Sequence, residues 1–141
     1  MLFRSASIAA GVAQDAAANG NVASTSTDNT VTYDTIAPTV TINQAGTQAD
    51  PTSIQPIVFT VVFSEAVTGF DAADVQLSGT AGGARIVAVV LLDERTFRVE
   101  ITGLTTGGVL TATVRINAAF DAAGNPSLAS IATDNTVTFT P

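Results

Sequence analysis

The stretch PIVFTVVFSEAV, residues 56–67, decides the fold because apolar residues occupy both of its faces. Side chains alternate between the two faces of a strand, so every second residue shares a face. The fully apolar face consists of Ile57, Phe59, Val61 and Phe63. Val58 and Val62 are apolar on the other face, where a surface strand would carry polar residues. The pattern therefore predicts a strand in the centre of a sheet.

Six further segments alternate in the same way, with threonine at many of the positions between apolar residues. Asp93 and Glu94 separate two of these segments and predict a hairpin, and Asp71 and Asp74 are expected to cap the turn before another. The six segments are residues 39–43, 74–79, 84–92, 95–104, 108–116 and 135–140. Seven short strands predict an all-β fold in which two sheets pack as a sandwich.

The composition excludes several kinds of site and partner. The 141 residues include no Cys and no His, so disulfides and thiolate zinc sites are excluded. Twelve acidic residues against five basic ones give a net charge of −7, which argues against nucleic acid as a partner. The longest apolar run, IVAVVLL at 86–92, is far too short for a spanning helix, so we expect no membrane insertion.

Catalysis has little chemical basis in this sequence. The five basic residues are all arginines, so no lysine, histidine or cysteine is present to act as nucleophile or base. No serine stands in a nucleophile elbow. One Tyr and no Trp leave few aromatic platforms for a sugar. We therefore expect a protein that is not an enzyme.

The chain contains one of its endings twice. A shift of 106 positions lays residues 7–33 over residues 113–139, and the match is unbroken through TDNTVT at 27–32. Shared composition would not keep register across a Gly/Asn turn and a strand together, so we interpret the stretches as two copies of one module. We expect residues 34–141 to form a complete domain and residues 1–33 to be the C-terminal end of a preceding repeat.

The partial copy is expected to be loosely held, because it lacks the strands with which a complete module would pair it. Residues 1–27 should be poorly ordered, and NTVTYD at 29–34 should form an orphan terminal strand. We also hypothesise that Leu2–Ser5 is not native to the repeat.

Four stretches carry a resemblance to a known family: DTIAPTVTI, FTVVFSEAVTGFDAADVQLSG, RVEITGL and NAAFDAAGNPS. They resemble the bacterial immunoglobulin-like repeats found in tandem in large surface adhesins and biofilm-associated proteins. The resemblance covers residues 34–140 and the partial copy. It implies a seven-stranded immunoglobulin-like β-sandwich with Greek-key topology, whose partners are neighbouring repeats in the same chain.

The same resemblance implies a stalk outside the cell. Such repeats belong to secreted or cell-surface proteins, contribute length and stiffness to adhesion, and are often stiffened by Ca²⁺ between modules. The alternative function is an accessory module of an extracellular enzyme or receptor, which would bind a glycan or a protein through its loops. No motif in the chain identifies the ligand of such a module.

Acidic residues of the linker and the loops form a candidate calcium site. In a sandwich of alternating strands, the turn after every second strand returns to the end where the first strand starts. Calcium takes about six to eight oxygens from carboxylates, amides and backbone carbonyls. The candidate ligands at this end are Asp34, Glu65, Asp71, Asp93, Asp121 and Asn125, with Glu94 beside them. Asp34 and Asp121 are the strongest candidates, and bound calcium would stiffen the joint between repeats.

Ordinary turn chemistry explains the same residues without a metal. Asp121 in DAAGN can close an Asx turn by accepting nearby backbone N–H groups, with Gly124 or Asn125 at positive φ. Asp34 can be a polar linker residue and Glu65 a hydrated loop residue. The sequence leaves both interpretations open.

Overall fold

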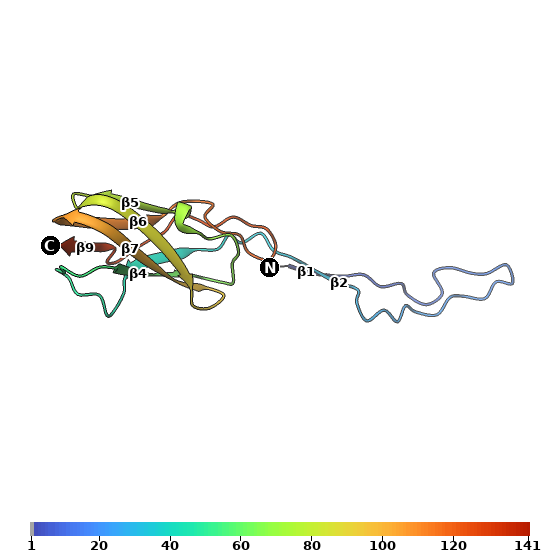
Figure 1. The fold of residues 1–141 in the computed structure, drawn as a ribbon. Helices are drawn as coiled ribbons and strands as arrows, with labels where there is room; N and C mark the ends of the chain where they lie inside the picture. The colour runs from blue at the N-terminus through green and yellow to red at the C-terminus, as the bar shows by residue number, and fades with distance from the viewer. Residues whose placement is uncertain (1) are drawn as a thin grey trace. The chain divides into compact units, whose positions relative to one another are not determined.

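The computed structural model describes residues 2–141, which form two compact units. The first unit ends at Ile36 and the second begins at Ala37. In the first unit, β1 (Leu2–Ser5) pairs antiparallel with β2 (Thr30–Tyr33), and a long loop joins the two strands (Figure 1). Within the described chain, no helix is both long enough and apolar enough to cross a membrane.

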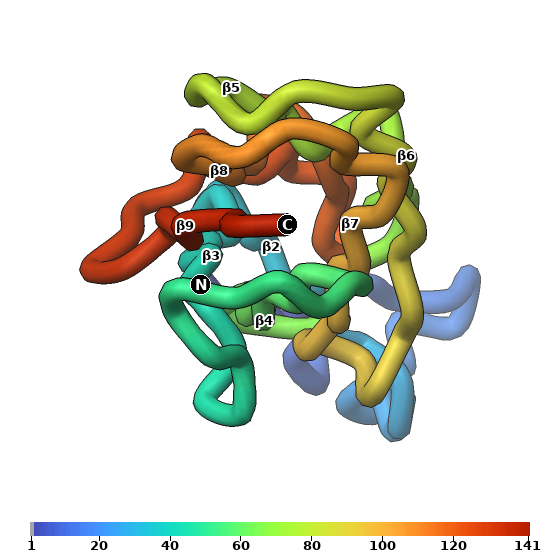
Figure 2. The backbone as a smooth tube through the Cα atoms, turned by 60° about the vertical axis from the view of Figure 1, so that its left-hand side comes forward, coloured from blue at the N-terminus to red at the C-terminus, as the bar shows by residue number. Residues whose placement is uncertain are grey.

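The second unit is all-β, as the alternating segments predict. Its strands form one sheet in the order β3-β4-β7-β6 and another in the order β5-β8-β9, with antiparallel neighbours in both. The strands are β3 (Val40–Gln44), β4 (Ile57–Phe63), β5 (Val75–Gly79), β6 (Gly82–Leu91), β7 (Thr96–Thr106), β8 (Gly108–Val114) and β9 (Thr136–Phe139). Figure 2 shows β5 and β8 on the side of the unit opposite β4, as expected of a sandwich.

β4 is the central strand that its sequence predicts, because it pairs with β3 on one side and with β7 on the other. Its fully apolar face is at most 1% exposed. The opposite face differs, since Val58 is only half-buried and Val62 is 39% exposed. A two-sheet sandwich covers one face of each sheet and leaves the other toward solvent.

The core lies between the two sheets. β8 contributes Leu110, Ala112 and Val114, and β9 contributes Val137 and Phe139, all of them at most 2% exposed. These residues and the apolar face of β4 belong to one cluster of buried side chains. Burying one such aliphatic or aromatic side chain contributes about 1.5–3 kcal/mol, most of which chain entropy offsets. Packing stabilises the sandwich without disulfides, because the chain has no Cys.

Three phenylalanines cluster within this core. The ring centroid of Phe63 lies 5.4 Å from that of Phe70 and 5.8 Å from that of Phe97. The ring centroids of Phe70 and Phe97 are 5.0 Å apart. All three pairs meet edge to face, the arrangement that the aromatic quadrupole favours. Phe63 is the last residue of β4, so this cluster anchors the segment that continues to Glu65.

β6 and β7 form the hairpin that the Asp93–Glu94 pair predicts. The Asp93 carboxylate accepts hydrogen bonds from the backbone N–H groups of Arg95 and Thr96, each at 2.9 Å. The bond from Arg95, supported by Thr96, lowers the pKa of Asp93 below its ordinary value. The Asp93 carboxylate therefore stabilises the turn in which it lies.

A short 3-10 turn, η1 (Ala72–Asp74), precedes β5 and is capped as expected. The Asp71 carboxylate accepts the Ala73 N–H at 2.7 Å, and the Asp74 carboxylate accepts the Asp71 N–H at 2.9 Å. Asp74 is 3% exposed and forms an ion pair of 2.6 Å with Arg115. Both aspartates are therefore engaged in local structure.

β2 has a partner that the sequence did not predict. Thr30–Tyr33 forms the expected strand, but it pairs with Leu2–Ser5 and is not an orphan. This pairing was not predicted from the sequence because Leu2–Ser5 was given no place in the repeat. All residues of β1 and β2 are exposed, so the two strands bury no core of their own.

Candidate functional site

Asp121 lies between β8 and β9 and closes an Asx turn. Its Oδ1 accepts the backbone N–H groups of Ala123 and Asn125, and its Oδ2 accepts the Asn125 side-chain amide, all at 2.8 Å. Gly124 has a φ of +86°, a conformation that glycine adopts without steric cost. The turn expected for DAAGN is confirmed, with Gly124 at positive φ.

The environment of Asp121 favours its charged form. Asp121 is only 6% exposed, and desolvation by itself would raise its pKa. Hydrogen bonds from the side chain and backbone of Asn125, and from the backbones of Ala123 and Gly124, together outweigh desolvation and lower the pKa of Asp121 below its ordinary value. The turn therefore holds a negative charge in a nearly buried position.

The lowered pKa of Asp121 predicts acid sensitivity of the second unit. A carboxyl whose pKa is lower in the folded state stabilises the fold above its unfolded value of about 3.9, and this stability is lost as pH falls through the folded pKa. Thermal melts from neutral pH downward should show Tm falling more steeply below about pH 4 for the unsubstituted chain than for Asp121→Asn, which has no proton to bind. Parallel curves would contradict this assignment.

Two other predicted ligands, Glu65 and Asp34, are held by hydrogen-bonded segments. Before Glu65, the Ser64 N–H donates to the Thr39 carbonyl at 2.9 Å, and the Thr39 N–H donates to the Ser64 hydroxyl at 3.0 Å. Asp34 follows β2, and its Oδ1 accepts the Ile36 N–H at 3.1 Å. Both acidic residues are half-buried. Each carboxylate is therefore partly withdrawn from bulk water.

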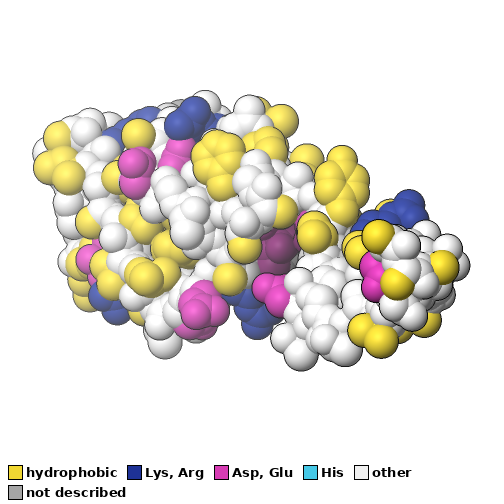
Figure 3. Space-filling model, turned by 90° about the vertical axis from the view of Figure 1, so that its right-hand side faces the viewer, with side chains coloured by type: hydrophobic (Ala, Val, Ile, Leu, Met, Phe, Trp, Pro, Cys, Tyr) yellow, Lys and Arg dark blue, Asp and Glu magenta, His cyan; other side chains and the backbone are white. Residues whose placement is uncertain are grey.

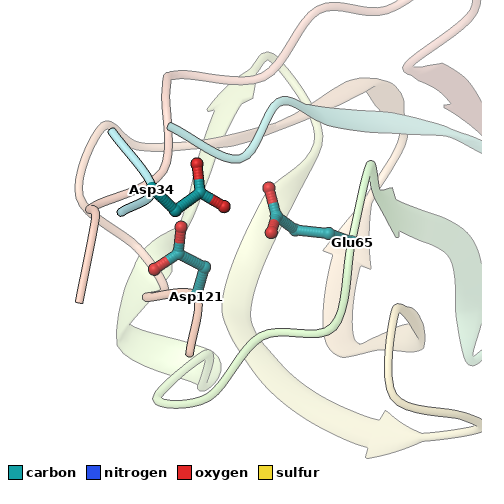
Figure 4. Close-up of side chains that lie close together, drawn as sticks. All are labelled: Asp34, Glu65 and Asp121. Atoms are coloured by element: carbon teal, nitrogen blue, oxygen red, sulfur yellow. The ribbon is translucent and has the colours of Figure 1, made fainter. Parts of the chain in front are cut away.

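The carboxylates of Asp34, Glu65 and Asp121 form an acidic group. One oxygen from each lies within 4.8 Å of the other two, and Figure 4 shows the three carboxylates close together. Like charges at such separations repel by about 1 kcal/mol in water and more where water is displaced. A cation placed among them would turn this repulsion into attraction.

The Asx turn leaves Asp121 able to bind a cation. A carboxylate offers about four lone-pair sites, and the bonds from Ala123 and Asn125 use three of them. Oδ2 accepts only one of these three bonds, from the Asn125 side chain. Calcium needs about six to eight oxygens, so backbone carbonyls and water would have to complete the shell that three carboxylates begin. The two interpretations of Asp121 are therefore compatible with each other.

The predicted carboxylate ligands Asp71 and Asp93 are not members of this acidic group. Asn125 donates its side-chain N–H to Asp121 and thereby positions that carboxylate. Asp71 caps η1, and Asp93 closes the β6–β7 turn. These roles are the ones that turn chemistry alone would assign to them.

The sequence did not predict a shallow apolar cavity in the second unit. Its volume is about 320 Å³, and its walls include Val67, Leu91, Phe120 and the acidic Glu94. Leu91 is 63% exposed and Phe120 is 44% exposed. Small-molecule sites commonly have mostly apolar walls with a few polar or charged groups.

The function has to be inferred from the residues of this chain alone. No family model, curated protein or solved structure matches it. The two features that bear on function are the internal repeat at an offset of 106 and the acidic group of Asp34, Glu65 and Asp121.

Proposed function

We propose that the chain is a non-catalytic part of the stalk of a secreted or cell-surface bacterial adhesin. The stalk consists of seven-stranded immunoglobulin-like repeats with Greek-key topology, arranged in tandem. Two observations support this proposal: the second unit is an all-β sandwich, and the ending of that unit recurs within the same chain at an offset of 106. The contribution of each repeat is length and spacing.

Calcium stiffens the joint between repeats in this proposal. The observation that carries it is the group formed by Asp34, Glu65 and Asp121, whose oxygens lie within 4.8 Å of one another. Asp34 comes from the segment that precedes β3, whereas the other two come from loops of the sandwich. A cation shared by all three ties that segment to the loops, and removal of the cation frees it.

A calcium-specific rise in Tm is the expected result. Residues 1–141 are melted in EDTA and then in millimolar calcium, followed by circular dichroism. A ligand that binds only the folded state stabilises it by about 2.7 kcal/mol at 100 times its Kd, which raises Tm by several degrees. Magnesium at the same concentration should give a smaller shift, because it demands near-octahedral geometry and dehydrates reluctantly.

Asp15→Asn is the matched control for Asp121→Asn. Asp15 accepts the same three hydrogen bonds, from the Ala17 N–H and from the backbone and side chain of Asn19, but it stands outside the acidic group. Both variants weaken an Asx turn, yet only Asp121→Asn and Asp34→Asn should lose the calcium shift. Superimposed melts in EDTA and calcium would rule out calcium binding, and the proposed function would then be that of a spacer without a metal.

An accessory ligand-binding module is the second candidate, and the cavity beside Phe120 and Glu94 favours it. Such a module would stand next to a catalytic or receptor domain in its parent protein. A stalk would instead show further copies at the same period. Sequencing the parent gene on both sides of this chain distinguishes the two.

A further inference from the structure

The first unit reproduces the strand pairing of the last two strands of the sandwich. Leu2 faces Tyr33 in β1 and β2 as Gly108 faces Phe139 in β8 and β9. All four residue pairs of β1 and β2 correspond to pairs of β8 and β9 at the same offset of 106. The structural repeat therefore begins earlier than the sequence match, which starts at residue 7.

The loops between these strands also coincide. The Gly11 N–H donates to the Asn21 carbonyl as the Asn117 N–H donates to the Ser127 carbonyl, both at 2.9 Å. Gly11 and Asn117 both have positive φ, at 74° and 60°. The Asx turns described above recur in the same way. The first unit therefore has the backbone of the β8–loop–β9 part of a sandwich.

The two copies differ in the burial of equivalent side chains. Positions that lie in the core of the second unit are open to solvent in the first, and hydrophobic side chains are visible on the molecular surface in Figure 3. The equivalent pairs, with exposed fractions, are Val114 and Ile8 (2% and 60%), Val137 and Val31 (0% and 68%), and Phe139 and Tyr33 (2% and 65%). The first unit thus exposes the surface that the second unit packs away.

The residue types of the first unit suit burial at those positions. Each of the three exposed side chains is apolar or aromatic, like its buried counterpart. At two positions that are exposed in the second unit, the first unit carries polar residues: Gln14 at the place of Phe120 and Thr25 at the place of Ile131. At a third exposed position, that of Leu128, it carries the apolar Val22. Apolar character is therefore kept at the three core positions of Ile8, Val31 and Tyr33.

We propose that Ile8, Val31 and Tyr33 form one half of the core of a sandwich. A five-stranded segment like residues 37–106 packs on this surface and supplies the other half. This segment precedes the first unit in the parent protein, as β3–β7 precede β8 and β9 in the second unit. The inference rests on the proposed tandem array and deepens it by naming the surface and its partner. A second copy of this chain does not supply the segment, because its own β8 and β9 cover its β3–β7.

Two residues of β1 do not fit such a core. Arg4 stands at the position of Leu110, which is 0% exposed, and would bring an unpaired charge into it. Leu2 stands at the position of Gly108, where φ is +152° and a Cβ would lie 2.5 Å from the Ala81 nitrogen. A test therefore has to replace β1 by the corresponding residues of β8.

The test places residues 37–112 directly ahead of Ser7 in the full chain, so that the added segment runs into the first unit in the register of the repeat. The extended chain also carries Ala9→Arg, because Ala9 takes the place of Arg115, the partner of buried Asp74. Tyr33 is the single tyrosine, the chain has no Trp, and the added segment contains neither, so Tyr33 fluorescence reports on the first unit alone.

Burial of the first unit is the expected result. Acrylamide quenching of Tyr33 should fall severalfold in the extended chain relative to residues 1–141. Amide exchange across Thr30–Tyr33 should slow by about 100-fold or more, because it would then require opening of a packed sandwich. Unchanged quenching and unchanged exchange would overturn the proposed partner.

Two valine substitutions give matched controls. Val31 corresponds to buried Val137, whereas Val22 corresponds to Leu128, which is 47% exposed. In the extended chain, Val31→Asp should restore fast quenching and exchange, and Val22→Asp should leave both slow. Equal effects of the two variants would show that the Val31 face is not the contact. The calcium melt of residues 1–141 is independent of this result, so failure here and failure of the metal site are distinguishable.

Discussion

Replacing Val137 by aspartate is expected to lower the free energy of unfolding of the second unit by about 4 kcal/mol or more. Val137 is 0% exposed in β9 and belongs to the core cluster. A carboxylate at this position loses its hydration and gains no partner. Because small domains are stable by only about 5–15 kcal/mol, the variant should lose a large part of its stability. Urea unfolding followed by circular dichroism measures the loss.

The same substitution at Val31 is the control. Val31 occupies the equivalent position of β2 but is 68% exposed, so an aspartate there stays hydrated. The expected change is within about 0.5 kcal/mol, as for most surface substitutions. Both valines stand in the sequence TVT within a strand, so the comparison isolates burial from strand propensity. Equal losses would contradict the difference in burial between the two units.

The strands were predictable because an alternating apolar pattern specifies a buried face. β4 is the best example, since Ile57 to Phe63 carry apolar residues on the core side at every second position. Which strands pair with each other was harder to predict from the sequence. β5 pairs with β8, and β6, which follows it along the chain, joins the other sheet. Nothing local in Val75–Gly79 indicates this choice, because pairing depends on contacts distant in sequence.

The acidic group was predictable in part, for a geometric reason. Counting turns placed Asp34, Glu65 and Asp121 at one end of the sandwich, and their oxygens lie within 4.8 Å. The same count included Asp71 and Asp93, which lie outside the group. Strand parity gives the end at which a loop lies, but not its position across that end. The local turns, each held by its own carboxylate, decide the rest.

The repeated Asx turn shows how local chemistry acts independently of burial. Asp15 is exposed and Asp121 is nearly buried, yet both accept the same set of hydrogen bonds. Ala18 adopts a φ of 67° where the other copy has Gly124, at a cost of about 1–2 kcal/mol. The turn by itself is therefore no indication of a metal. The turn of Asp121 differs from that of Asp15 because two further carboxylates lie close to Asp121.

Truncating Phe63 to alanine is the second large effect, with an expected loss of about 3–5 kcal/mol in the free energy of unfolding. Phe63 is 1% exposed and contacts the rings of Phe70 and Phe97 edge to face. The variant loses both contacts and leaves a cavity that the rigid sheet can only partly close. Urea unfolding of Phe63→Ala against the unsubstituted chain measures the loss.

Phe120→Ala is the control within the same unit, because it removes the same number of atoms from a side chain that is 44% exposed. Its expected loss is at most about 1.5 kcal/mol, since roughly half of the ring is already in water. Phe63 also stands two residues before Glu65, so its packing fixes where that carboxylate begins. If core packing positions the acidic group, Phe63→Ala should reduce the calcium-dependent rise in Tm as well as the stability. A full calcium shift in a destabilised Phe63→Ala variant would mean that the hydrogen bonds between Ser64 and Thr39 are sufficient to hold Glu65.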